Sequence, residues 1–253
     1  MGKFADLLLA MNSANSVIAL REATIALFRS LGWQAAYFVF PVNAERGPKR
    51  LMTNIGFPEE WEKAYRGGLC RFDPLPDIAR KLAHPFSWTS IPASLSLTSE
   101  ELGYIASLSD WDMTAGVGIP TYGPRGRVGY VGIGLPESKD LAEAPDFARL
   151  RIAAESSFLR YCDITLNETS STIPLSGRER DVLQLIARGL HKAEIADALS
   201  ISKNTVDTYF RRIYSKLEVS DRAAAVTIGL AEGLIVTGEA VITEDMLRRQ
   251  PKP

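Results

Sequence analysis

The sequence predicts an α+β protein with two domains: an α/β/α sandwich built on an antiparallel sheet, and a smaller domain made only of helices. The first observation is the order of elements over residues 1–166, which runs helix, strands, helices, strands and a final helix. The second is the polar run NETSSTIP at 167–174, which has no periodicity and is typical of a linker. The third is that only helical patterns follow at 175–236, before a polar tail at 237–253.

The composition is that of a globular protein and already restricts its function. The chain has 253 residues, 46% of them hydrophobic, which is enough for two ordinary cores. The formal net charge is −1, so a nucleic-acid reader in this chain must gather its positive charge locally. No apolar run approaches the roughly 20 residues of a membrane helix, and the start of the chain does not have the pattern of a signal peptide. We therefore expect a cytoplasmic protein with no membrane partner.

Hydrophobic periodicity predicts the elements of the first domain. Residues 17–31 are apolar at helical spacing, and Gly32 follows as a C-cap. The aromatic and β-branched run at 33–42 predicts a buried strand. A capping box of Thr98 and Glu101 predicts another helix, which runs to about Ser109. The remaining predicted elements are a strand near 51–55, a helix opened by Pro58, a helix at 77–84, strands at 115–122 and 127–135, and a long helix at 145–166.

The C-terminal helices have clear boundary signals. Ser176 and Glu179 form a second capping box, and Gly189 ends the helix that they open. The predicted helices span 177–188, 192–199, 203–217 and 221–233. On the third of them, apolar residues repeat at intervals of four, three and four to give one buried stripe: Val206, Phe210, Ile213 and Leu217.

The third of these helices concentrates positive charge on its exposed face. Between residues 203 and 216 it has four basic residues and one acidic residue, a net charge of +3. Two helices joined by a short turn, the second with a basic exposed face, are what a reader of the DNA major groove requires. We expect Arg211 to read a base, and Lys203 and Arg212 to bond phosphates. The candidate DNA contacts are Lys203, Asn204, Thr205, Asp207, Thr208, Arg211 and Arg212.

The pieces LSGRERDVL, ARG, EIADALSIS, NTVDTY, KLEVSDRAAAV and GLI occur in this order within residues 175–234. This dense pattern resembles the LuxR/FixJ class of helix-turn-helix domains. The resemblance implies a four-helix domain in which 203–217 is the recognition helix and 221–233 a dimerisation helix. Tyr209 and Arg212 depart from the family pattern, so its DNA site sequence does not carry over. The alternative is an ordinary helical bundle whose charges form a solvated face.

An apolar, aromatic pocket with one carboxylate is predicted in the first domain. Trp61 and Tyr65 lie four residues apart and share a helix face. Asp73 follows in a turn, and Trp88 comes later. A buried indole N–H can donate to a carbonyl, while a buried carboxylate accepts from an amide N–H, which suits a small amphipathic ligand. We expect Asp73 to be buried and ionised, supported by the amide N–H of such a ligand and by neighbouring polar groups.

Together with Pro74, Gly116 and the segment 119–126, these residues resemble the autoinducer-binding domain of LuxR-type quorum-sensing regulators, over residues 15–165. That family reads N-acyl-homoserine lactones. The resemblance implies that Trp61 bonds the lactone carbonyl and that Asp73 accepts the amide N–H. It also implies that Tyr65 and Trp88 pack against the ring and chain. The candidate ligand-binding residues are Phe57, Trp61, Tyr65, Asp73, Leu75, Trp88, Gly116 and Gly132.

Three of these positions depart from the family pattern. Phe57 stands where many relatives have a tyrosine whose hydroxyl holds the acyl carbonyl. Leu75 and Gly132 stand where many have serine or threonine. The lactone head group therefore has its partners, whereas the acyl carbonyl lacks donors. We also expect Gly118 and Gly132 to leave the strand wall smooth and roomy.

Taken singly, these residues also have a structural interpretation. Trp61 and Tyr65 would be core residues, and Asp73 before a proline would be a turn or helix-cap residue. Their combination, upstream of a DNA-binding domain, favours the pocket.

We expect a ligand-responsive transcription regulator that senses an N-acyl-homoserine lactone. It would bind an inverted-repeat site in double-stranded DNA as a homodimer, with RNA polymerase as a further candidate partner. The alternative is a solo or antagonist-type regulator that answers a different small molecule or none. An enzyme is disfavoured because the sequence has no nucleophile elbow, metal-ligand spacing or phosphate loop, and we expect no cofactor. A phosphorylated receiver is disfavoured because the first half lacks a parallel α/β alternation and an acidic cluster.

Overall fold

The computed structural model of the protein describes residues 2–42, 46, 50–169 and 175–235. The chain divides into two compact units, and the division falls after Ser170. The last helix of the first unit continues to Thr169, three residues past its predicted end, so residues 167–169 are helix and not linker. The rest of the predicted linker, 170–174, and the predicted tail at 237–253 lie outside the described residues.

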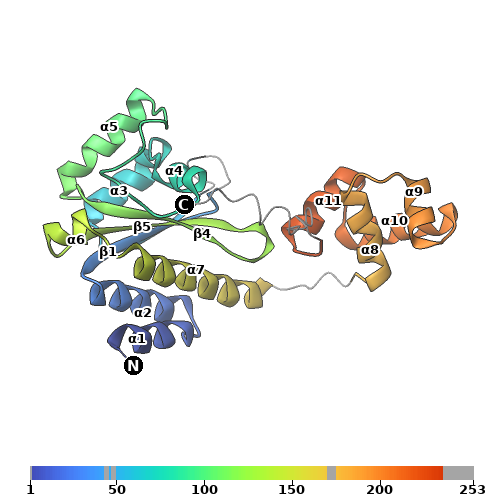
Figure 1. Ribbon diagram of the computed structural model, residues 1–253, viewed down its shortest axis with the longest axis horizontal. Helices are drawn as coiled ribbons and strands as arrows, with labels where there is room; N and C mark the ends of the chain where they lie inside the picture. Colours follow the sequence, from blue (N-terminus) through green and yellow to red (C-terminus); the bar gives the residue numbers. More distant parts are fainter. Residues whose placement is uncertain (1, 43–45, 47–49, 170–174, 236–253) are drawn as a thin grey trace, which may run out of the picture. The chain divides into compact units, whose positions relative to one another are not determined.

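Five antiparallel strands form the sheet of the first unit, in the order β2-β1-β5-β4-β3. Figure 1 shows β1, β4 and β5 side by side. They are β1 (Trp33–Phe40), β2 (Leu51–Ile55), β3 (Phe86–Ser87), β4 (Gly116–Tyr122) and β5 (Val128–Pro136). Tyr37 on β1 lies opposite Gly132 on β5, and Gly132 lies opposite Gly118 on β4. The antiparallel sheet is confirmed, although β3 is too short to give a periodic signal.

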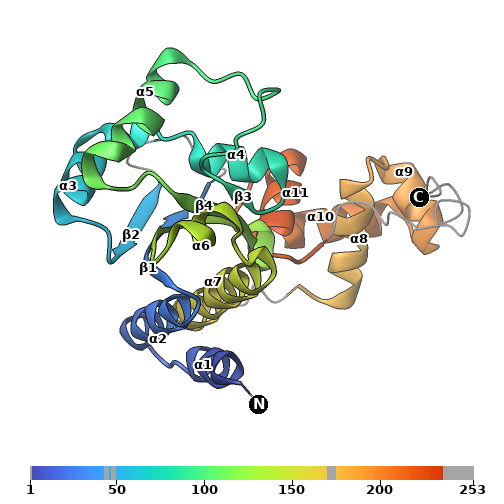
Figure 2. The same cartoon turned by 60° about the vertical axis from the view of Figure 1, so that its left-hand side comes forward.

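Helices cover both faces of this sheet, which confirms the α/β/α sandwich (Figures 1 and 2). On one face lie α1 (Lys3–Asn12), α2 (Val17–Ser30) and α7 (Phe147–Thr169). On the other lie α3 (Glu59–Gly67), α4 (Leu75–Leu82) and α5 (Ser99–Ser107). Shorter elements are η1 (Leu69–Arg71), η2 (Leu108–Trp111), η3 (Pro124–Gly126) and α6 (Lys139–Glu143). The sequence pattern does not predict α1. Helix α4 begins two residues early because Pro76 fits its first turn, where a helix has no N–H to bond.

The alternation of side chains along each strand gives the first unit two cores. Val117, Ile119, Val131 and Ile133 point toward α2 and α7 and form one core with them. Tyr37 and Tyr130 point to the other face, where Gly116 and Gly118 of β4 and Gly132 and Gly134 of β5 also lie. That second core is rich in aromatic residues, and it contains every sequence-predicted ligand residue that has a side chain except Asp73, which lies at its edge.

The second unit is the predicted four-helix domain. Its helices are α8 (Gly177–Ala187), α9 (Lys192–Leu199), α10 (Lys203–Leu217) and α11 (Arg222–Ala231). Both halves of the Ser176–Glu179 capping box are present, as are those of the Thr98–Glu101 box in the first unit. Among the helices that the structure describes, none has both the length and the apolar character to cross a lipid bilayer.

Candidate ligand site and DNA interface

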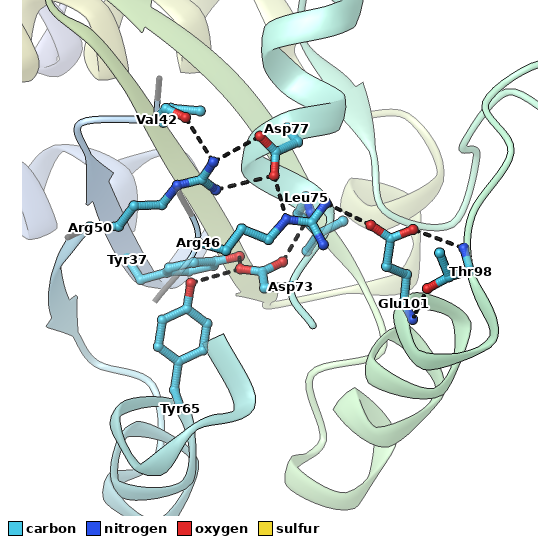
Figure 3. A network of polar contacts seen from close by, with 10 residues as sticks. All are labelled: Tyr37, Val42, Arg46, Arg50, Tyr65, Asp73, Leu75, Asp77, Thr98 and Glu101. Carbon is cyan, nitrogen blue, oxygen red and sulfur yellow. Dashed lines mark hydrogen bonds and ion pairs between the residues drawn. The ribbon is translucent and has the colours of Figure 1, made fainter. Parts of the chain in front are cut away.

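Asp73 is the polar centre of the aromatic core, and only 1% of it is exposed. Its Oδ1 accepts the backbone N–H of Leu75 at 2.9 Å, which also anchors the start of α4. Its Oδ2 accepts the hydroxyls of Tyr65 at 2.9 Å and Tyr37 at 3.3 Å (Figure 3). Asp73 therefore bonds the start of α4 and also faces the aromatic core, so its interpretation as a helix-cap residue and its interpretation as a pocket residue are compatible. It has three donors from the protein itself, one of which, Tyr37, the sequence analysis does not identify.

The protonation of this cluster follows from its burial. Desolvation raises the pKa of Asp73 to about 6, although hydrogen bonds from Leu75, Tyr65 and Tyr37 and the charge of Arg46 oppose the rise. Asp73 is therefore mostly ionised at pH 7, as expected. Burial, and then the Asp73 charge, raise the pKa of Tyr37 well above its usual value, and the pKa of Tyr65 likewise. Both hydroxyls stay protonated and act as donors.

A chain of hydrogen bonds leads from Asp73 to Trp88. The hydroxyls of Tyr37 and Tyr130 are 3.5 Å apart, and Trp88 Nε1 donates to the Tyr130 hydroxyl at 3.1 Å. A tyrosine has one hydroxyl proton, and that of Tyr37 goes to Asp73, so Tyr130 supplies the proton between the two tyrosines. This chain fixes the Trp88 indole and the Tyr37 ring against the sheet.

Four glycines on this face of β4 and β5 are each covered by an aromatic ring. The pairs are Trp88 on Gly116, Phe86 on Gly118, Tyr37 on Gly132 and Phe57 on Gly134. A Cβ at Gly132 would overlap Cε1 of Tyr37, and one at Gly118 would overlap the Phe86 ring. The expectation of a roomy wall at Gly118 and Gly132 is therefore wrong, because rings from β1 and β3 fill the space that the glycines leave.

Two donors in the aromatic core lack an acceptor. Trp61 Nε1 and the Tyr104 hydroxyl are buried without a hydrogen-bond partner among the residues that the structure describes. Burial raises the pKa of Tyr104, and the nearby indole of Trp61 opposes part of that rise. The indole N–H and the Tyr104 hydroxyl nevertheless do not have the geometry of a hydrogen bond. An unpaired buried donor costs about 1–3 kcal/mol. Trp61 Nε1 and the Tyr104 hydroxyl are therefore two donors of this core that can still donate to an acceptor atom.

Two arginines hold the polar edge of this site together (Figure 3). Arg46 pairs with Asp77 of α4 through Nε and Oδ2 and with Glu101 of α5 through Nη2 and Oε1, both at 2.6 Å. Arg50, immediately before β2, pairs with Asp77 at 2.9 Å. Burial raises the pKa of Asp77, but the hydrogen bonds from Arg50 and Arg46 outweigh it and lower the pKa overall. These pairs join α4 and α5 beside Asp73, and no sequence motif marks them.

All eight sequence-predicted ligand residues meet at this site. The residues that sequence reasoning missed are Tyr37, Arg46, Tyr104 and Tyr130. Tyr37 and Tyr130 lie in apolar strands and look like ordinary core residues. The signal that could have found Tyr37 is Gly132, since a glycine inside a strand indicates a close approach by another group.

The candidate DNA contacts all lie on α10. Those with exposed side chains are Lys203, Asn204, Arg211 and Arg212, and those half-buried are Thr205, Asp207 and Thr208. Ser202 caps the helix by accepting the Thr205 N–H at 3.0 Å. Arg211 Nη2 lies 3.5 Å from the Thr208 hydroxyl, so these two side chains share one face of the helix.

Two of the charges counted on α10 are used within the helical domain. Asp207 pairs with Lys192 of α9. Lys216 pairs with Glu179 of α8, Nζ to Oε2 at 2.7 Å, where Glu179 is 3% exposed. Lys216 therefore stabilises the packing of α8 on α10. Asp207 and Lys216 cancel each other in the predicted net charge of +3, so that charge comes from the other three basic residues of α10. The exposed basic residues of α10 that form no ion pair within the described residues are Lys203, Arg211 and Arg212.

Helix α11, the dimerisation helix that the family resemblance implies, has small residues that lie inside the domain. Ala225 and Gly229 are buried, and a Cβ at Gly229 would lie 2.9 Å from Cδ2 of Leu183 on α8. Their small size allows close packing between two helices of one chain, so they are unavailable to a second chain. The exposed positions of α11 are Ala223, Thr227 and Ala231, beside half-buried Leu230.

The two units match two known domain families. The profile described as "Autoinducer binding domain" matches residues 18–161, more than half of the chain. The profile described as "Bacterial regulatory proteins, luxR family" matches residues 173–228.

Among similar proteins is the HTH-type transcriptional regulator y4qH of Sinorhizobium fredii, 26% identical over 183 residues, which are 72% of this chain and 56% of y4qH. The transcriptional activator AhyR of Aeromonas hydrophila is 24% identical over 204 residues, 78% of each chain. The crystal structure of Escherichia coli SdiA superposes with a TM-score of 0.66 at 18% identity, covering 92% of this chain and 98% of SdiA. SdiA in complex with octanoyl-rac-glycerol superposes with a TM-score of 0.64 at 17% identity, covering 93% and 96%. At these identities the SdiA structures support the fold alone.

The two profiles match in the order in which the two units occur along the chain. The named relatives are regulators of transcription and not enzymes. The chain therefore belongs to the LuxR family of transcription regulators, with an autoinducer-binding domain followed by a luxR-type helix-turn-helix DNA-binding domain.

Proposed function

We propose that the first domain binds an N-acyl-homoserine lactone and that the protein binds an inverted-repeat DNA site as a homodimer. The ligand proposal rests on one observation: the same aromatic core contains a buried donor without a partner, Trp61 Nε1, and a buried carboxylate, Asp73. A lactone amide has the complementary groups, a ring carbonyl that accepts and an amide N–H that donates. Tyr65 and Trp88 supply the aromatic walls.

Asp73 has capacity left for such a ligand. A carboxylate offers about four lone-pair sites, and the protein fills one on Oδ1 and two on Oδ2. A ligand amide can therefore donate to Oδ1 while the tyrosines keep Oδ2. A charge-assisted hydrogen bond of this kind is stronger than one between neutral groups.

The second candidate is a ligand of a different class, and one observation favours it. Asp73 already accepts three hydrogen bonds from the protein, so the site does not require an amide donor. SdiA, which shares the fold, is known in complex with octanoyl-rac-glycerol. A monoacylglycerol would bring an ester carbonyl to Trp61 and hydroxyl donors to Asp73.

The DNA part of the proposal rests on the exposed charges of α10. Arg211 can bond a guanine bidentately, and Lys203 and Arg212 can bond phosphates on either side of it. Two copies related by a two-fold axis would place two such helices in successive major grooves. A regulator that activates transcription from such a site would also contact RNA polymerase.

The test is to identify the ligand that the full chain retains. The protein is purified from cells supplied with a mixture of acyl-homoserine lactones and octanoyl glycerol, and bound molecules are identified by mass spectrometry. Asp73→Asn protein is the matched control for retention through this site. Recovery of a lactone with the parent and not with the variant supports the proposal. Retention of octanoyl glycerol instead of any lactone favours the second candidate.

A further inference from the structure

The ring of Tyr37 lies at the centre of the aromatic core. Five other rings have their centroids within 5.1–6.2 Å of it: Phe57, Trp61, Tyr65, Trp88 and Tyr130. The side chain is fully buried. A ligand that touches both Trp61 and Asp73 must lie against Tyr37, because the ring packs on Trp61 and the hydroxyl bonds Asp73.

The position of this ring depends on Gly132. The two residues are opposite each other on β1 and β5, and a Cβ at position 132 would overlap Cε1 of the ring. A side chain at 132 and the Tyr37 ring therefore exclude each other. Glycine at this position gives the ring the space directly above the sheet.

The ring is also held at its far end. Its hydroxyl donates to Asp73 at 3.3 Å and lies 3.5 Å from the Tyr130 hydroxyl. Tyr130 is in turn fixed by the Trp88 indole N–H. A side chain that is confined by packing along its length and by hydrogen bonds at its tip does not swing aside easily.

The neighbouring glycines on this face leave no open space for an acyl chain. Each of the remaining three is covered by its own ring, Trp88, Phe86 or Phe57. A long flexible acyl chain leaving the Asp73 region would have to displace one of these rings. A short or compact acyl group requires a smaller displacement of these rings than a long chain does.

We infer that Tyr37 is the specificity-determining residue of this site and restricts it to ligands with a short or compact acyl group. This inference rests on the proposed function. In it, the bulk of the Tyr37 ring above Gly132 sets the limit on acyl length, and packing against the five surrounding rings keeps it in place.

The test compares butanoyl- and dodecanoyl-homoserine lactone as ligands of the full chain, with the ratio of their dissociation constants as the readout. The parent should favour the butanoyl compound by about tenfold, because the eight additional methylene groups of the dodecanoyl chain cannot be buried without displacing a ring. Tyr37→Ala, which removes the ring, should shift that ratio toward the dodecanoyl compound by about tenfold or more. Tyr37→Phe is the matched control, since it keeps the ring and loses only the hydroxyl. It should retain the preference of the parent.

Tyr37→Leu serves as a second variant with a smaller, still apolar side chain, in case Tyr37→Ala does not fold. A parent that binds the dodecanoyl compound at least as tightly as the butanoyl compound overturns the inference. The same holds if both ring-removing variants fold and keep the parent's ratio. If neither lactone binds to the parent or to any folded variant, the proposed function itself fails.

Discussion

Tyr37 on β1 and Gly132 on β5 form a matched pair across the sheet, in which the ring of one occupies the place of a side chain on the other. Neither residue belongs to a recognisable sequence motif. Their relationship arises only when the two strands pair, and it places the Tyr37 hydroxyl on Asp73. The pair explains how a strand lined with glycines can belong to a closely packed core.

The first prediction concerns this pair and stability. Gly132→Ala should lower the free energy of unfolding by roughly 1–3 kcal/mol, because the new methyl group forces the Tyr37 ring off its position. The same substitution should cost clearly less in a Tyr37→Leu background. Gly103→Ala on α5 is the control: a Cβ there meets nothing within 4 Å, so it should be neutral or slightly stabilising. Urea unfolding of the parent and of these four variants (Gly132→Ala, Tyr37→Leu, the double variant and Gly103→Ala) measures this, and equal costs of Gly132→Ala in both backgrounds would contradict it.

The second prediction concerns pH. Burial raises the pKa of Asp73 from its ordinary 3.8 to about 6, so the folded state binds this proton more tightly than the unfolded state does. The contribution of Asp73 to stability is therefore greatest below about pH 4 and is lost as the pH rises through 6. The change amounts to about 3 kcal/mol for roughly two pKa units.

Asp73→Asn removes this titration, so the variant isolates it from the other acidic groups. The free energy of unfolding of the parent minus that of Asp73→Asn should fall by about 2 kcal/mol between pH 4 and pH 6 and level off above about pH 7. A difference that is independent of pH would mean that Asp73 is not titrating as a buried group.

The third prediction concerns Arg46. Arg46→Ala breaks its ion pairs with Asp77 and Glu101, both of which are mostly buried, and should cost about 1–3 kcal/mol. It should also raise the pKa of Asp73 further, since the charge of Arg46 lowers it. Arg151→Ala is the control, because its pair with Glu155 is exposed on α7 and should contribute under about 1 kcal/mol. Equal effects of the two substitutions in thermal melts would show that Arg46 does not join α4 to α5.

The fourth prediction concerns DNA. Arg211→Ala should weaken binding to the specific site by roughly 1–3 kcal/mol and relax the preference at one base pair. Lys203→Ala should weaken binding to all sequences alike and reduce the slope of log affinity against log salt by about 1. Titrations over a set of variant sites at several salt concentrations separate the two. An unchanged site preference in Arg211→Ala would remove this residue from base readout, and Arg151→Ala should change neither quantity.

Much of the fold follows from local pattern. The two capping boxes and the strands β4 and β5 depend on residues close together in the chain, so the sequence predicts them. The candidate ligand residues on α3 and at the start of α4 are also close together in the chain, so a family sequence pattern can identify them. Local pattern does not determine which long-range partner a residue meets.

The residues that escaped prediction all depend on such partners. Tyr37 needs Gly132, and Lys216 on α10 needs Glu179 on α8, so each looks like an ordinary strand or surface residue in the sequence. Gly229 is small because α8 packs against it, a reason that the sequence of α11 alone does not distinguish from contact with a second chain.

The most direct test of the account is the shift in melting temperature that lactones cause in the full chain. A ligand at 100 times its dissociation constant adds about 2.7 kcal/mol to stability. The parent should therefore show a clear shift with at least one acyl-homoserine lactone. Asp73→Asn should lose much of the shift and Trp61→Phe part of it, while Phe57→Tyr, which adds a hydroxyl, should increase it. No shift in the parent with any lactone, together with DNA binding that is indifferent to ligand, would contradict the assignment of this site to an acyl-homoserine lactone.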